Sequence, residues 1–228
     1  MKYPRSLLCI AAIACLPINI VTVASSPLES NTDVFISSQP PKAAWVTVVG
    51  DYDNDGWLDF IGFSGRQLTF IRGLGNGTFA VPRSIPLDEE PLGIDVADYD
   101  LNGWLDVALV LASKELVVFY GKPSGLFEEG SRRALEGLNT QHVGRRLVSG
   151  DFNADEHPDI AIRQTYGGGI FLIPSSGRSG FAEEVVLDPD RTVSAVKIID
   201  VNGDGVDDII ALYNWGAHGI IWQHPHVL

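Results

Sequence analysis

The chain has almost no cysteine. Only Cys9 and Cys15 occur among 228 residues, and both fall within the first 24 residues, which we expect to be a signal peptide. The mature protein, residues 25–228, would then contain no disulfide bond. A secreted protein without disulfides needs another source of rigidity. Bound metal ions are one such source, because metal binding can contribute directly to folding free energy.

The N-terminal segment has the parts of a secretory signal. Lys2 and Arg5 precede an apolar stretch from Leu7 to Val23, and Ala24 ends a run of small residues suited to cleavage. The stretch is short for a membrane span and contains Pro17. We therefore predict cleavage after Ala24 and secretion to an extracellular, periplasmic or cell-surface location. An uncleaved membrane anchor is the alternative.

Positive charge and catalytic motifs are both scarce. Sixteen Lys and Arg residues stand against 29 Asp and Glu residues, for a formal net charge of −13. Such an acidic balance argues against nucleic acid as a partner. The motifs G-x-S-x-G and H-E-x-x-H and a phosphate-binding glycine loop do not occur. We therefore name no catalytic residue and expect a protein that is not an enzyme.

What the chain does have is a short acidic loop that occurs four times. The copies read DYDNDGWLD from Asp51, DYDLNGWLD from Asp98, DFNADEHPD from Asp151 and DVNGDGVDD from Asp200. Their first residues lie 47, 53 and 49 residues apart. Carboxylate and amide oxygens at alternate positions of a tight loop suit a hard divalent cation, so the repeat predicts a ligand as well as an architecture.

The segments around each loop predict β-strands. An apolar, β-rich run precedes each loop, a second follows it, and a third comes after a short gap. A glycine-rich turn then leads to a phenylalanine (Phe79, Phe127 and Phe181) that we expect to open a fourth strand. Four short strands in about fifty residues are typical of a propeller blade. We predict an all-β propeller with four blades of four antiparallel strands.

The last repeat has no room for its fourth strand before Leu228. The segment DVFISSQPP around Phe35 resembles a fourth strand without the three before it. We expect this N-terminal strand to complete the last blade and so remove exposed sheet edges. A monomer is then favoured over a dimer. The alternatives are that the chain is part of a larger propeller or pairs with a second copy to complete one.

The pattern of strand, D-x-D-x-D-G-x-x-D loop, strand and G-x-G-T-F turn resembles the FG-GAP/VCBS repeats of integrin α-subunit propellers and of many secreted proteins. The resemblance extends from about Asp33 to Leu228. It implies a β-propeller whose blades each hold calcium in the hairpin between the first two strands. It implies no single activity, because fold and function are separable.

Carried over to this sequence, the resemblance implies side-chain ligands at loop positions 1, 3, 5 and 9 and a backbone carbonyl at position 7. The implied ligands are Asp51, Asp53, Asp55, Trp57 and Asp59; Asp98, Asp100, Asn102, Trp104 and Asp106; Asp151, Asn153, Asp155, His157 and Asp159; and Asp200, Asn202, Asp204, Val206 and Asp208. Three loops have glycine at position 6, but the third has Glu156. We expect three or four calcium ions, with the site at Asp151 the weakest or empty.

An EF-hand starts with a similar pattern but needs an acid at position 12. Position 12 is Gly62, Leu109, Ile162 and Ala211 in the four loops, so the sequence favours a hairpin site closed by position 9. The simpler alternative, that these clusters are turns without metal, is less compatible with four matched spacings.

Three functions remain open at this stage. The first is a non-catalytic binding module for a glycan or an extracellular protein, because rigid scaffolds with variable loops suit recognition. Trp57 and Trp104 are candidates for stacking on sugar rings. The second is a polysaccharide lyase or hydrolase, with His142 and nearby arginines as the only candidate groups. The third is a structural interaction protein of the cell surface.

Overall fold

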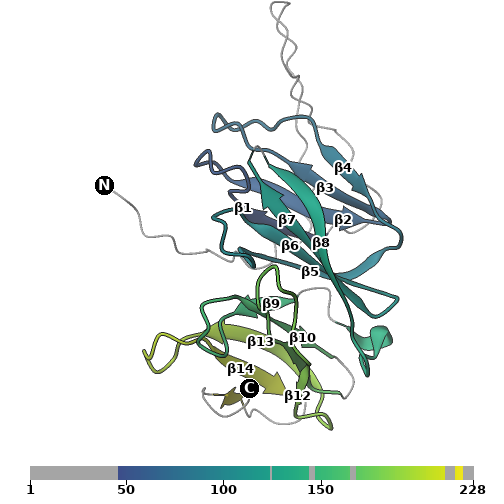
Figure 1. Ribbon diagram of the computed structural model, residues 1–228, viewed down its shortest axis with the longest axis vertical. Helices are drawn as coiled ribbons and strands as arrows, with labels where there is room; N and C mark the ends of the chain where they lie inside the picture. Colours follow the sequence, from purple (N-terminus) through teal and green to yellow (C-terminus); the bar gives the residue numbers. More distant parts are fainter. Residues whose placement is uncertain (1–45, 124, 144–146, 165–167, 214–218, 223–228) are drawn as a thin grey trace, which may run out of the picture.

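Nearly all regular structure in the computed structural model is β-strand, and it forms four antiparallel sheets (Figure 1). The structure describes residues 46–123, 125–143, 147–164, 168–213 and 219–222. Each sheet is a meander of strands that follow one another in the chain. We number the sheets as blades 1 to 4.

The strand bounds confirm the repeat predicted from sequence. Blade 1 contains β1 (Val46–Gly50), β2 (Asp59–Ser64), β3 (Gln67–Ile71) and β4 (Arg83–Pro86). Blade 2 contains β5 (Pro91–Ala97), β6 (Asp106–Leu111), β7 (Glu115–Lys122) and β8 (Leu126–Ala134). A 3-10 turn, Thr140–His142, follows blade 2.

The second half of the chain repeats this plan (Figure 1). Blade 3 contains β9 (Val148–Gly150), β10 (Asp159–Arg163), β11 (Ile170–Ile173) and β12 (Val185–Leu187). Blade 4 contains β13 (Val193–Ile199), β14 (Asp208–Tyr213) and β15 (Gly219–Trp222). The fourth sheet therefore has three strands among the described residues. The expected clasp strand around Phe35 and the signal peptide lie outside them.

Consecutive blades pack face to face, because their second and third strands are apolar and largely buried on both faces. Three apolar clusters fill the junctions between blades 1 and 2, 2 and 3, and 3 and 4. Strands β6 and β11 are buried along their whole length, and the first strands β1, β5, β9 and β13 contact one another in turn. This arrangement is a β-propeller fold with four blades.

The turn phenylalanines behave differently from expectation in two blades. Phe127 lies within β8, as predicted. Phe79 and Phe181 instead form isolated bridges with Gly73 and Ser175, and the fourth strands begin four residues later. All three phenylalanines pack against their surroundings: the centroids of the Phe79 and Phe60 rings are 5.2 Å apart, and Phe127 and Phe181 pack against the clusters between blades. The difference is therefore in backbone pairing and not in burial of the ring.

No helix among the described residues is long and apolar enough to cross a membrane.

The first strand of each blade leads into an acidic loop and the second strand follows it, with identical pairing at the base of all four hairpins. The residue before the loop pairs with its last aspartate: Gly50 with Asp59, Ala97 with Asp106, Gly150 with Asp159, and Ile199 with Asp208. The fold thus presents four equivalent loops.

Buried hydrogen bonds between blades should contribute measurably to stability. The hydroxyl of Tyr99 is 2.6 Å from Oγ of Ser149 on the next blade, whereas the Tyr52 hydroxyl donates only to Val48 O of its own blade, at 3.4 Å. We predict that Tyr99→Phe lowers the free energy of unfolding by about 1 kcal/mol. Tyr52→Phe, the matched control, should change it less in urea unfolding. Equal losses would contradict an inter-blade role for Tyr99.

Candidate metal centre

Each acidic loop is eight residues long and joins the first and second strands of a blade. Position 1 is the first aspartate of the loop, and position 9 is the aspartate that begins the second strand. The four loops therefore place the same positions at the same point of each hairpin, as the repeat predicted.

The backbone turns sharply at two positions in every loop. Position 4 has a positive φ in Asn54, Leu101, Ala154 and Gly203, and position 6 has one in Gly56, Gly103, Glu156 and Gly205. Glu156 takes φ 71°, where the three glycines take 89° or 90°. The third loop thus follows the same path as the others, at the cost of a strained residue. The expectation that it binds metal most weakly stays a prediction.

The aspartate at position 1 organises the loop from within. Its two oxygens accept the backbone N–H groups of positions 5 and 6 in all four loops, at 2.7–3.2 Å. The side chain at position 5 in turn accepts the N–H of position 7, at 2.7–2.9 Å. These contacts hold the oxygens of positions 1 and 5 around the loop centre.

The aspartate at position 9 is fully buried in every blade. In blade 1, Oδ2 of Asp59 accepts the N–H of Tyr52 at 2.9 Å and Oδ1 accepts the N–H of Gly73 at 2.7 Å. Asp106 and Asp159 make the same pair of contacts, and Asp208 accepts the N–H of Val201. This carboxylate therefore joins the loop, the second strand and the end of the third strand.

Burial is unfavourable for these carboxylates in their charged form. It raises the pKa of Asp59 to about 6 and the pKa values of Asp106 and Asp159 to about 7, against the opposing effect of the backbone hydrogen bonds. Burial, followed by the charge of Asp55, also raises the pKa of Asp53. A bound cation would offset this cost.

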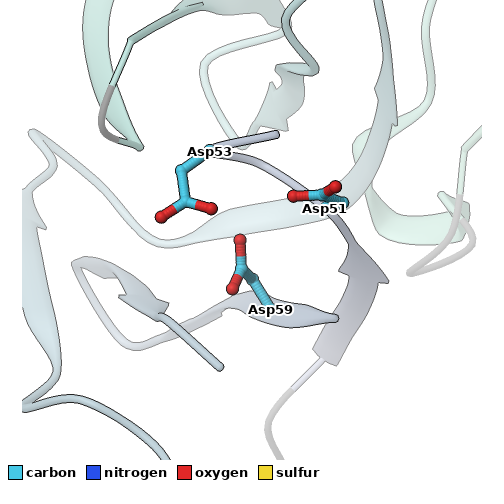
Figure 2. Close-up of side chains that lie close together, drawn as sticks. All are labelled: Asp51, Asp53 and Asp59. Atoms are coloured by element: carbon cyan, nitrogen blue, oxygen red, sulfur yellow. The ribbon is translucent and has the colours of Figure 1, made fainter. Parts of the chain in front are cut away.

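The first two loops bring three carboxylates together. Ligand oxygens of Asp51, Asp53 and Asp59 lie within 4.8 Å of one another, and Figure 2 shows the three side chains around one space. Asp98, Asp100 and Asp106 form the equivalent group. Oδ1 of Asp53 is buried and makes no hydrogen bond within the structure. A buried, unpaired carboxylate oxygen beside two further carboxylates fits a divalent cation.

The third and fourth loops have asparagine at position 3. The amide of Asn153 donates to Asp155 at 3.1 Å, and the amide of Asn202 donates to Asp204 at 2.9 Å. Within the described parts of the chain, only the first two loops form a three-acid group. The predicted ligands of loops 3 and 4 share the hairpin geometry but have one charge fewer at position 3.

Two arginines at the first two loops carry no signal in the sequence. Arg72 lies 3.4 Å from Asp53, and Nε of Arg178 lies 2.5 Å from Oδ2 of Asp100. Arg178 comes from the next blade and also lies over the Tyr120 ring, 4.6 Å from its centroid. Each arginine supplies positive charge next to position 3, so these loops are less repulsive than their acids alone suggest.

The position 7 residues differ in exposure. The Trp57 side chain is 51% exposed, whereas Trp104, His157 and Val206 are half-buried. A Cβ on Gly75 would lie 2.2 Å from the Trp57 ring, so the indole rests directly on the backbone of this turn. The predicted coordination by the four position 7 carbonyls stays a prediction.

The fold and the four oxygen-rich hairpins define a class of protein: a β-propeller with candidate cation sites in its blade hairpins. The family model described as "FG-GAP-like repeat" matches residues 51–109 and 151–211, which is more than half of the chain. The chain therefore belongs to the FG-GAP-like repeat family. A search of curated proteins found no match.

Solved structures show the same fold at low sequence identity. A lectin from Agrocybe aegerita, described as recognising non-reducing terminal N-acetylglucosamine, is 20% identical with a TM-score of 0.58, covering 75% of this chain and 47% of that one. A BBS1N–ARL6DN complex is 13% identical with a TM-score of 0.53, covering 81% and 59%. The chain thus spans about half of the lectin and under two thirds of BBS1N.

Substitutions at positions 3 and 9 should separate metal binding from folding. Asp59→Asn should cost about 1–3 kcal/mol without metal, because an amide cannot accept both backbone N–H groups. Asp53→Asn should cost less metal-free stability, because loss of the ion pair with the partly exposed Arg72 is offset by removal of a buried charge next to Asp55, but it should weaken calcium binding roughly tenfold. Urea unfolding in EDTA and calorimetric calcium titration measure the two effects. Equal metal-free losses would contradict the distinction.

Proposed function

We propose that the protein is a secreted, calcium-stabilised binding module that recognises a glycan through the loop-bearing rim of its propeller. The observation that carries this proposal is the half-exposed Trp57 ring, which rests on Gly75 beside the first metal loop. Two supports come from the scaffold: the four equivalent hairpins and the cation fit of the first two loops.

Calcium is the ion that best suits these loops. The candidate donors are all oxygens, from carboxylates and asparagine amides and, by expectation, from position 7 carbonyls. Calcium accepts six to eight oxygen ligands in flexible geometry, whereas magnesium keeps several waters and demands a regular octahedron. The ligands would be the residues at positions 1, 3, 5, 7 and 9 of each loop, giving three or four ions. The ions would serve as structural clamps.

Secretion is part of the same proposal. Loops of this kind in extracellular modules bind calcium weakly, with dissociation constants of about 0.1–1 mM, so they need the millimolar calcium found outside cells. The predicted signal peptide, residues 1–24, is the sequence feature that supports export.

Trp57 offers a flat apolar surface that suits a sugar ring. One face of the indole lies against Gly75, and the side chain keeps about half of its surface exposed. A ring held in this way loses little conformational entropy when a ligand stacks on it. The resemblance to the Agrocybe aegerita lectin supports a glycan ligand. A protein ligand is the second candidate, supported by the BBS1N–ARL6DN complex as a protein-binding example of this fold.

Removal of calcium should destabilise the protein strongly. At a dissociation constant near 0.1 mM and about 1 mM calcium, each site would add about 1.4 kcal/mol to the free energy of unfolding. Three sites together should raise Tm by about 10 °C. We therefore predict a fall in Tm of this size in excess EDTA, reversed by calcium but not by an equal concentration of magnesium. An unchanged melting curve would refute the clamp role.

Trp57→Ala should weaken glycan binding without loss of fold. Trp104→Ala is the matched control, because Trp104 holds the same loop position but is half-buried. A glycan array probed with the calcium-loaded protein should show binding that Trp57→Ala lowers about tenfold or more, as expected for an aromatic anchor. Binding to no glycan would contradict the proposal, and release of product from a polysaccharide would favour the enzyme alternative. Of the groups named for that alternative, Arg132 pairs with Glu129 and Arg133 pairs with Glu184. The side chains of His142, Arg145 and Arg146 lie outside the described part of the structure.

A further inference from the structure

The three blade junctions inside the chain are built from the same loop positions. The aromatic residue at position 2, which is Tyr52, Tyr99 or Phe152, is at most 5% exposed and packs toward the next blade. The residue two places before the loop of the next blade packs against the preceding blade. Val96 is 3% exposed in the cluster between blades 1 and 2, and Ile198 joins the cluster between blades 3 and 4. Each blade therefore contacts the next blade through one set of positions, which we call the forward set. It contacts the preceding blade through another set, which we call the backward set.

A tight contact joins the two sets at the rim. A Cβ on Gly50 would lie 2.7 Å from Cδ1 of Leu105, which is position 8 of the next loop. A Cβ on Gly150 would lie 2.6 Å from Asp207, position 8 of the fourth loop. Asp207 also accepts the N–H of Asp151 at 3.0 Å. Position 8 thus rests on the residue that precedes the previous blade's loop.

The forward set of blade 4 is exposed. Ile199, which precedes the loop, is 52% exposed, and Val201 at position 2 is 45% exposed. Leu212 is 50% exposed, although the equivalent residues twelve places after position 1, Phe63 and Val110, are at most 1% exposed. These three apolar side chains form what we call the forward face: Ile199, Val201 and Leu212.

The backward set of blade 1 is exposed as well. Leu58 at position 8 is 60% exposed, whereas its equivalents Leu105 and Asp207 are half-buried against the preceding blade. Val49, two places before the loop, is 38% exposed, although the equivalent Val96 is buried. We call Val49 and Leu58 the backward face. Both halves of a blade junction therefore exist on one molecule, and both are left in solvent.

We propose that a second copy of this chain covers both faces, with the forward face of each copy packed on the backward face of the other. A heterologous contact of this kind either closes into a ring or continues as a filament. Two copies of a four-blade chain would close a ring of eight blades, within the range of four to eight that propellers typically adopt. The monomer expected from the sequence is the alternative that the experiment below distinguishes.

Side-chain size at the forward face requires a junction that is wider at the rim than the internal ones, because a Cβ on the equivalent Gly50 would already lie 2.7 Å from Cδ1 of Leu105. The internal junctions combine glycine or alanine before the loop with Tyr or Phe at position 2, whereas blade 4 combines Ile199 with Val201. One residue is larger and the other smaller, so the face keeps its apolar character but changes shape. A junction with a distinct shape would restrict pairing to blade 4 of one copy and blade 1 of the other.

Charge substitutions at the paired positions test the proposal. Sedimentation velocity of the calcium-loaded wild-type chain should show a species with the mass of two chains. Ile199→Glu and Leu58→Lys should each weaken the dimer by about thirty-fold or more, since each buries a charge at an apolar contact. Leu126→Glu is the matched control, because Leu126 is a 52% exposed leucine on β8, away from both faces, and it should leave the dimer intact.

Mixing the two variants gives the decisive result. Ile199→Glu and Leu58→Lys chains can form a mixed ring in which one junction is wild-type and the other joins glutamate to lysine, so dimer should reappear on mixing. Unchanged far-UV circular dichroism spectra at 20 °C in calcium would show that each variant still folds, because loss of the dimer can by itself lower the melting temperature. A wild-type monomer, a dimer insensitive to both substitutions, or a failure of mixing to restore it would overturn the proposal.

Discussion

The buried carboxylate at position 9 of each loop is the contact on which the rest of the blade depends. In blade 1, the oxygens of Asp59 accept N–H groups from the loop and from the end of the third strand, so one side chain fixes three segments. The same contacts recur at Asp106 and Asp159. Because burial disfavours the charged form, the cost of each carboxylate must be offset by these hydrogen bonds and, in our account, by a cation.

This constraint links folding to recognition. Acids at positions 1, 3 and 9 crowd the first two loops, and Arg72 and Arg178 supply part of the compensating charge. A calcium ion would supply the rest and would fix the hairpin tips that form one rim of the propeller. Trp57 belongs to such a tip, so the interactions that stabilise the loop also position the ring that we propose as the binding platform.

The repeat made much of this structure predictable. Spacing of the loops and their flanking apolar runs predicted the number of blades, the order of strands and the position of the acidic loops in the first hairpin of each blade, because these depend on local sequence. Contacts between distant segments could not be read in the same way: Arg178 reaches Asp100 across 78 residues. The start of β4 and β12 was also missed, because Phe79 and Phe181 form only isolated bridges with Gly73 and Ser175 and regular pairing begins four residues later. Solvent exposure of Leu58 and Ile199 likewise follows from the arrangement of blades and has no local signal.

The most direct test of the central claim is a count of bound ions. Native mass spectrometry of the chain, purified in calcium and exchanged into a volatile buffer, would report how many ions each molecule retains. The mass of each retained ion would identify the metal. The account predicts three or four calcium ions per chain, with the site at Asp151 emptied first at low calcium. A chain that retains no ion, or that binds a transition metal in preference to calcium, would contradict it.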